Sequence, residues 1–188
     1  MKQILFLLLV AAACQANAQY LTDNQGGNVR AGVAYVHDLP RLNGKAAYAD
    51  YSFPLNDWLQ GSAGLRHIET SGYPRTQTVR EYTKATSLDI NLLFVPLHTE
   101  NTALRLGVGY SFSYYNVRRS YPVYTSHTDA ATDVSWPQTD KKGLAHGISL
   151  IGEYEYSFGN NFSAGVKIAL VKAYGSVVMG GPFVGIKL

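Results

Sequence analysis

The stretch LRLGVGYSFSYY, Leu104–Tyr115, carries a bulky apolar or aromatic side chain at every second position. The positions between them hold Arg, Gly, Gly, Ser, Ser and Tyr. Successive side chains of a β-strand point to opposite faces, so the pattern predicts a strand with one apolar face and one small, polar face. The alternation alone leaves open which face meets water.

Seven further runs with this period occur along the chain, and no convincing helical stripe occurs after the first 28 residues. We therefore predict an all-β fold of eight strands. The predicted strands are Val29–Val36, Ala46–Phe53, Trp58–His67, Thr86–Val95, Thr102–Tyr115, Leu144–Tyr156, Phe162–Tyr174 and Val177–Leu188.

The connections between these runs alternate in length. Three are short turns, PLND, PLHTEN and SFGNN, whose Pro, Asn, Asp and Gly suit tight turns. On the other side lie HDLPRLNGK and two longer segments, residues 68–85 and 116–142. This asymmetry is typical of an antiparallel up-and-down transmembrane β-barrel with short periplasmic turns and long extracellular loops.

The composition of the small, polar face indicates that this face points into the lumen. It holds small residues and a nearly balanced set of charges, as expected for the narrow interior of an eight-stranded barrel. Turned toward lipid, each Arg or Lys would cost about 2–4 kcal/mol at the bilayer midplane. We therefore predict an ionic network that plugs the lumen. Its predicted members are Arg30, Asp50, Arg66, Asp89, Arg105, Glu153, Glu155, Lys167 and Lys187.

The apolar face is then expected to contact lipid, with aliphatic residues at mid-strand. Aromatic residues gather near the strand ends, where amphipathic rings meet headgroups. Only 15% of the chain is charged, less than the roughly 25–35% charged residues expected on a water-soluble surface. The weak net charge of +3 gives no indication of nucleic-acid binding.

Residues 1–18, MKQILFLLLVAAACQANA, have the layout of a secretory signal peptide. We expect residues 19–28 to form a flexible leader and residues 29–188 to form the barrel. The single cysteine, Cys14, lies within the predicted signal, so the exported chain would have no disulfide. Export and a barrel together predict the outer membrane of a Gram-negative bacterium.

On these patterns, from about Val29 to Leu188, the chain resembles the small eight-stranded outer-membrane barrels, namely the OmpA transmembrane domain and OmpX-like proteins. The resemblance implies a non-enzymatic protein that is inserted by the outer-membrane assembly machinery and does not conduct freely. It also implies contact with outer-membrane lipid and lipopolysaccharide. Two features depart from the family: the chain ends in Leu188 rather than an aromatic residue, and Pro182 interrupts the last strand. We expect MGGPF, Met179–Phe183, to form a bulge.

The longest connection, residues 116–142, is the candidate site for a surface ligand or protein, because barrel loops often carry binding residues. Its candidate binding residues are Arg118, Arg119, Tyr121, Tyr124 and Trp136. The alternative is a mobile solvated loop, or one folded back on the rim.

We expect a structural or interactive role, namely membrane integrity, adhesion or surface binding through the long loops. Two other functions stay open at this point. The first is a narrow porin-like channel. The second is a lipid A acyltransferase or deacylase using Ser126, His127 and Asp129, which carry a hydroxyl, an imidazole and a carboxylate. The five histidines never fall at ligand spacing, so we expect no metal site, and nothing in the sequence indicates a cofactor.

Overall fold

The computed structural model describes residues 26–38, 42–73, 79–126, 132–159 and 161–188. The predicted signal peptide and most of the predicted leader lie outside these residues. Ten strands are found: β1 (Asn28–Asp38), β2 (Leu42–Asn56), β3 (Leu59–Gly72), β4 (Glu81–His98), β5 (Thr102–Ser120), β6 (Val123–Ser126), β7 (Thr132–Ser135), β8 (Gln138–Phe158), β9 (Phe162–Lys172) and β10 (Ser176–Lys187).

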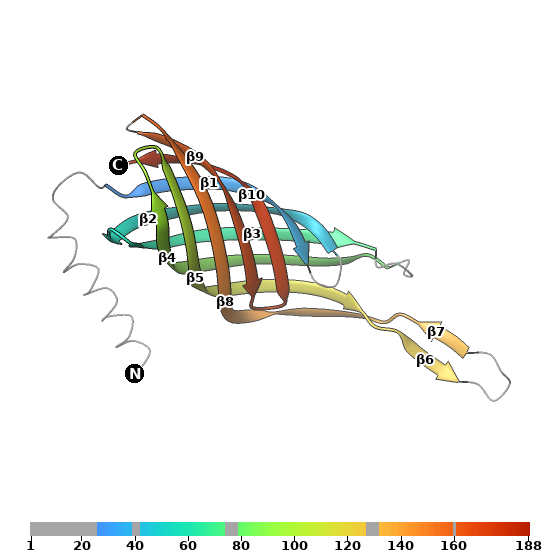
Figure 1. The fold of residues 1–188 in the computed structure, drawn as a ribbon. Helices are drawn as coiled ribbons and strands as arrows, with labels where there is room; N and C mark the ends of the chain where they lie inside the picture. The colour runs from blue at the N-terminus through green and yellow to red at the C-terminus, as the bar shows by residue number, and fades with distance from the viewer. Residues whose placement is uncertain (1–25, 39–41, 74–78, 127–131, 160) are drawn as a thin grey trace, which may run out of the picture.

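Eight of the strands form a closed antiparallel barrel in the order β1-β10-β9-β8-β5-β4-β3-β2, which confirms the predicted fold (Figure 1). The first and last strands close the ring, with Asn28 opposite Lys187. We call the end that holds the β2–β3, β4–β5 and β8–β9 turns the short-turn end, and the opposite end the long-loop end. Both chain ends of the barrel lie at the short-turn end. No helix in the described part of the chain is long and apolar enough to cross a membrane.

The strands run further toward the long-loop end than the sequence predicts. The segment 116–142 is not a simple loop: β5 and β8 stay paired up to Ser120 opposite Gln138, and the β6–β7 hairpin continues beyond them. Figure 1 shows this hairpin projecting past the other strands. Segment 68–85 is likewise shortened, because β3 ends at Gly72 and β4 begins at Glu81. Apolar periodicity stops where no face meets lipid, whereas backbone pairing continues in water.

The predicted bulge at Pro182 is wrong. Strand β10 keeps one register with β9 from Ser176 to Ile186, and its register with β1 is the same before and after the proline. Proline lacks an N–H and so removes a ladder hydrogen bond without inserting a residue. Side chains alternate regularly across it, with Phe183 buried and Val184 exposed.

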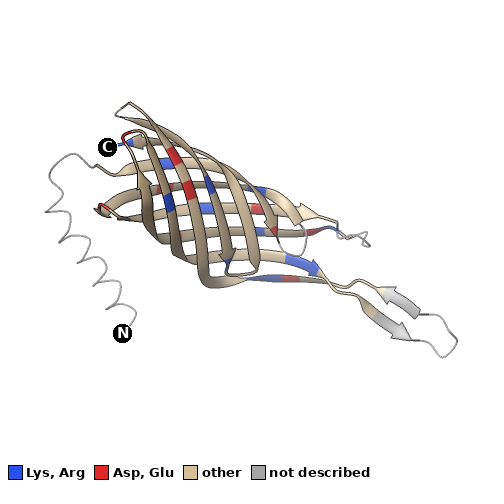
Figure 2. Cartoon of the chain, in the orientation of Figure 1, with Lys and Arg blue, Asp and Glu red and all other residues tan. Residues whose placement is uncertain are grey.

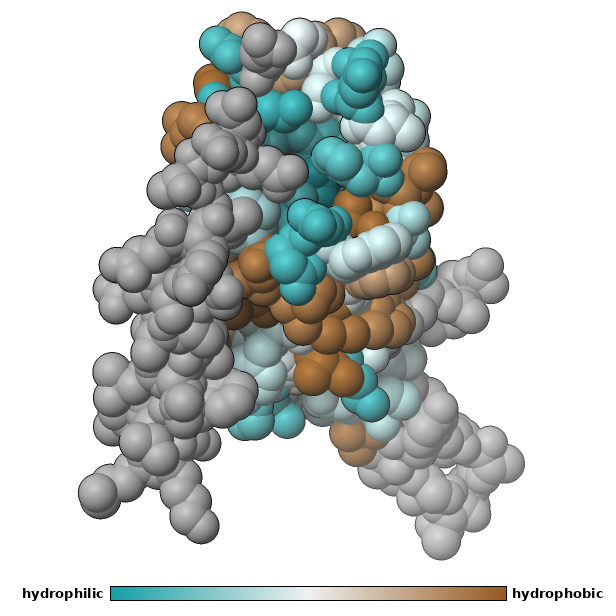
Figure 3. Space-filling model, turned by 60° about the vertical axis from the view of Figure 1, so that its left-hand side comes forward, coloured by the Kyte–Doolittle hydropathy of each residue, from teal (hydrophilic) through white to brown (hydrophobic). Residues whose placement is uncertain are grey.

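The apolar face points outward and the charged face inward, as predicted. Leu65 and Leu106 are 61% and 52% exposed, whereas Arg30 and Glu153 are 1% and 2% exposed. In Figure 3, hydrophilic residues gather in the middle of the visible face with hydrophobic residues beside them. Aromatic residues stack on the outside at the short-turn end, where the ring centroids of Trp58 and Phe94 are 6.2 Å apart.

The lumen also contains an apolar layer that the sequence did not predict. It is formed by Val36, Ile68, Val171, Val177 and Met179, each at most 2% exposed. On β1, β3 and β9 these side chains follow the charged lumen residues in the direction of the long-loop end. Charged and small residues therefore fill the lumen toward the short-turn end, and a tightly packed aliphatic layer follows them on the side of the long-loop end.

Candidate functional site: lumen and long-loop end

Four charged side chains from four strands meet in the lumen, and we call them the central ion cluster. Arg30 of β1 lies 2.6 Å from Asp50 of β2 and 2.5 Å from Glu153 of β8. Lys167 of β9 lies 3.0 Å from Asp50 and 3.1 Å from Glu153. Each carboxylate therefore contacts both cations, which offsets the cost of burying the four charges. In Figure 2, acidic and basic segments lie beside one another across the barrel strands.

Two aromatic rings line the same cluster. The Arg30 guanidinium lies 5.3 Å from the centre of the Phe183 ring, and the Lys167 ammonium lies 5.0 Å from the centre of the Tyr48 ring. Both rings are buried inside the barrel. A ring face attracts a cation at such distances, so the rings add to the cluster and exclude water from it.

A second pair continues the charged region toward the short-turn end. Arg105 bonds Glu155 at 2.5 Å and donates from Nε to Gln60 at 2.6 Å. Asn28 donates to Glu155 at 2.8 Å. Glu155 also lies 3.9 Å from Arg30, which joins this pair to the central ion cluster. A cavity of about 350 Å³ opens beside these residues at the short-turn end.

The three remaining residues of the predicted network lie apart from this connected group. Arg66 and Asp89 form their own pair at 3.1 Å, and Ser111 donates to Asp89 at 2.6 Å. Lys187 lines the cavity at the short-turn end and is only half-buried. The structure thus brings together six of the nine predicted charges, places two in a separate pair, and leaves Lys187 at the rim.

A further set of polar contacts closes the lumen at the long-loop end. Arg119 turns inward and donates to Asp38 and to the Thr83 hydroxyl, at 2.8 and 2.9 Å. Nearby, Glu81 accepts hydrogen bonds from the backbone N–H and hydroxyl of Ser120. The guanidinium of Arg119 is therefore engaged inside the barrel, so we do not retain it as a candidate for outward binding. Sequence reasoning missed Asp38 and Glu81 because they lie beyond the apolar alternation.

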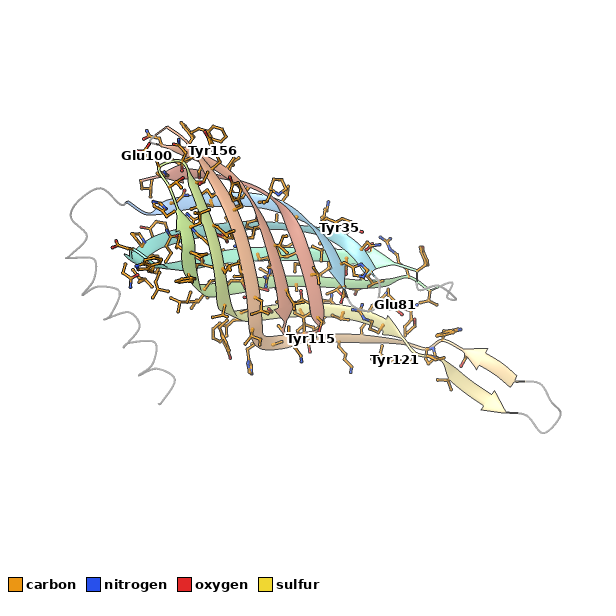
Figure 4. All side chains as sticks on the ribbon, viewed as in Figure 1. Tyr35, Glu81, Glu100, Tyr115, Tyr121 and Tyr156 are labelled. Atoms are coloured by element: carbon orange, nitrogen blue, oxygen red, sulfur yellow. The ribbon has the colours of Figure 1, made fainter. Side chains whose placement is uncertain are left out.

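The other candidate binding residues lie on or beyond the outer parts of β5 and β8. Arg118 faces outward, makes two hydrogen bonds to Asp140 at 2.7 and 2.8 Å, and lies over the Tyr82 ring. These hydrogen bonds lower the pKa of the Asp140 carboxyl below its usual value. Figure 4 places Tyr121 at the base of the β6–β7 hairpin, where it is exposed. Trp136 is half-buried, and the side chain of Tyr124 lies outside the described part of the structure.

Outward-facing cations occur at only one end of the barrel. At the long-loop end, five strands each present one outward cation: Lys45, Lys84, Arg118, Lys142 and Lys172. We call these residues the cation ring. Among the described residues at the short-turn end, none that faces outward is Lys or Arg. The outer surface is therefore electrically asymmetric along the barrel axis.

The proposed catalytic group cannot be assessed from the described residues, because His127 and Asp129 lie outside them. Within the described ranges, no group of three His, Cys, Asp or Glu residues could hold a metal ion.

The chain is similar in fold to several solved structures of small outer-membrane barrels. Neisserial surface protein A, NspA, is 14% identical, with 87% of this chain and 98% of that chain covered and a TM-score of 0.58. Ail, the attachment invasion locus protein of Yersinia pestis, is 11% identical, with 87% and 99% covered and a TM-score of 0.54. Ail in complex with the heparin analogue sucrose octasulfate is 14% identical, with 87% and 99% covered and a TM-score of 0.52.

No protein-family model matches the chain, and no match is found among curated proteins. At these identities the likeness concerns the fold. It confirms that the chain has the fold of the small eight-stranded outer-membrane barrels that the sequence resembles.

Proposed function

We propose that this chain is a non-enzymatic protein of the bacterial outer membrane that keeps its lumen closed and binds anionic ligands at its long-loop end. Membrane location is supported by the outward apolar side chains and by the aromatic residues near both strand ends. The names of its structural neighbours, among them a surface protein and an attachment protein, agree with a role at the cell surface.

The cation ring supports an orientation in which the long-loop end faces outward. The outer leaflet of this membrane carries the phosphates of lipopolysaccharide, and exposed Lys and Arg residues attract such groups. Because the cation ring is found only at the long-loop end, it favours contact of that end with the outer leaflet. The ring also leaves the long-loop end basic, because Glu69 and Asp140 are the acidic residues that pair with it on the described outer surface.

The closed lumen argues against the channel alternative. Ions entering from the short-turn end would meet the central ion cluster and then the apolar layer, in which Val36 and Ile68 have no exposed surface. A permanent current would require both layers to open. We therefore assign the protein's activity to its outer end rather than to transport.

The observation that carries the binding proposal is the continuation of β5 and β8 into the β6–β7 hairpin. Among the described strands, β6 and β7 pair only with each other, so both edges of this hairpin are sheet edges. Arg118 and the exposed Tyr121 lie at its base. A guanidinium and an exposed aromatic ring suit a sulfated or phosphorylated sugar, and Ail has been solved in complex with the heparin analogue sucrose octasulfate.

Heparin binding by the full protein in lipid nanodiscs tests this proposal. The double variant Arg118→Gln, Tyr121→Ser removes the guanidinium and the exposed ring at the base of the hairpin. We expect this variant to weaken heparin binding at least tenfold while gel migration stays heat-modifiable. Lys187→Gln removes one positive charge at the other end and serves as the charge-matched control. Unchanged heparin affinity in the double variant would refute the proposal.

A further inference from the structure

A small cavity lies inside the barrel between the central ion cluster and the pair of Arg66 and Asp89. Its volume is about 20 Å³. Charged residues of both groups line it, together with Asn91 of β4 and Ser149 of β8. A cavity of this size is large enough for one water molecule and too small for an organic ligand.

Three polar atoms on residues that line this cavity lack a hydrogen-bond partner among the described protein groups. They are Arg66 Nε, Asn91 Oδ1 and Ser149 Oγ. Their residues are 5%, 5% and 2% exposed, so bulk water does not reach them. An unsatisfied buried donor or acceptor costs about 1–3 kcal/mol, and three on the walls of one cavity are therefore unexpected without a shared partner.

Gly109 shows how closely two of these atoms converge. A Cβ built at this position would lie 2.0 Å from Asn91 Oδ1 and 2.4 Å from Ser149 Oγ. The two oxygens therefore lie close to each other against the Cα of Gly109, in the place that a side chain at residue 109 would take. Asn91 Nδ2 is already engaged, since it donates to Ser62 at 2.9 Å.

The chemistry of the three atoms identifies the occupant. Arg66 Nε–H needs an acceptor, Asn91 Oδ1 needs a donor, and the Ser149 hydroxyl can serve as either. A bare cation is excluded by Arg66 and Lys167, and an anion by Asp50 and Asp89. We infer that one ordered water molecule occupies this cavity, accepts from Arg66 Nε and donates to Asn91 Oδ1. It thereby links the pair of Arg66 and Asp89 to Asn91, which itself donates to Ser62.

This water site is independent of the proposed binding at the long-loop end. Its consequence concerns the lumen: the water joins residues of β3, β4 and β8 in one hydrogen-bonded group. The full protein, isotope-labelled and refolded in detergent, allows a direct test by nuclear Overhauser transfer between water and protein protons. The probe is the Nε–H of Arg66.

We expect a cross-peak from water to this proton, with the sign of a water held for longer than about a nanosecond. Ser87 and Ser113 provide the internal control, because their buried hydroxyls bond each other at 2.8 Å and should show no water contact. Absence of the cross-peak at Arg66 Nε–H would overturn the inference.

Ser149→Val supplies the matched variant, because it removes one partner and fills the cavity with a methyl group while suiting a strand. The variant should lose the Arg66 cross-peak and still show heat-modifiable migration. A cross-peak of unchanged intensity in folded Ser149→Val would also overturn the inference. Gly109→Ala is a less suitable test, because its Cβ would collide with Asn91 and could prevent folding.

Discussion

Glu153 is shared by two cations, Arg30 and Lys167, which reach it from β1 and β9. Removing one member of a buried ionic group leaves the others without compensation and typically costs about 3–5 kcal/mol. We therefore expect Glu153→Ala to lower the temperature at which the folded gel band disappears in detergent. Heat-modifiable migration over a temperature series measures this change.

Glu69→Ala is the matched control for Glu153→Ala. Glu69 also pairs with a lysine, Lys84, at 3.0 Å, but both side chains are exposed to solvent. Exposed ion pairs contribute little, so the melting temperature should stay close to that of the unchanged protein. Equal effects of the two substitutions would contradict a stabilising role for the central ion cluster.

The sequence predicts which side chains face the lumen, because side chains alternate between the two faces of a strand and charged groups avoid lipid. The partner of each charge could not be predicted in the same way. Arg30 bonds Glu153 across the lumen, although the two residues are 123 positions apart in the sequence. Contacts across the lumen depend on the tilt and stagger of the strands. Lys187, which has no ion-pair partner among the described residues, lies at the rim for the same geometric reason.

At the scale of a strand, β5 offers a direct test of facing. Leu106 points outward, whereas Ala103 points into the lumen beside the cavity at the short-turn end. Spin labels at these positions should behave oppositely: the label at 106 should be relaxed by lipid-dissolved oxygen, and the label at 103 should be shielded from it. Reversed accessibility would contradict the assignment of the two faces.

The outer part of β5 and β8 should respond to acid. Arg118 lowers the pKa of Asp140, so the ionised carboxylate stabilises the paired strands above its unfolded pKa of about 3.9. This contribution is lost as the pH falls through the lower folded value. We expect a carbon-detected NMR titration of Asp140 to give a midpoint below 3.9.

Arg118→Gln is the control for that titration, since it removes the donor and should return the Asp140 midpoint toward 3.9. A midpoint that does not move would show that the two side chains are not paired in solution.

The strands could be predicted from the sequence where they cross the membrane, because lipid requires apolar side chains at every second position. The alternation in β5 is clear from Leu104 to Tyr114, and its facing is confirmed. Beyond the membrane no such pattern exists, so the further pairing up to Ser120 and Gln138 was not predicted. The regular course of β10 at Pro182 was missed for another reason: the ladder tolerates one lost hydrogen bond without a change of register.

For the whole molecule, the layered lumen predicts no steady current in planar bilayers. It also predicts that Glu153→Ala alone will not open a conducting path, because the apolar layer formed by Val36, Ile68 and their neighbours remains. Single-channel recordings of the unchanged protein and of Glu153→Ala measure this current. A steady open level in the unchanged protein would favour the channel alternative, and one that arises only in Glu153→Ala would show that the apolar layer does not seal the lumen.

The central ion cluster draws its four members from β1, β2, β8 and β9, so its halves lie near opposite ends of the chain. Until the last strand meets the first, Arg30 and Asp50 neutralise only each other, and Glu153 and Lys167 do the same. The contacts that join these two pairs, from Arg30 to Glu153 and from Lys167 to Asp50, can form only when the ring closes. Closure of the sheet and completion of the cluster are therefore expected to be a single cooperative step.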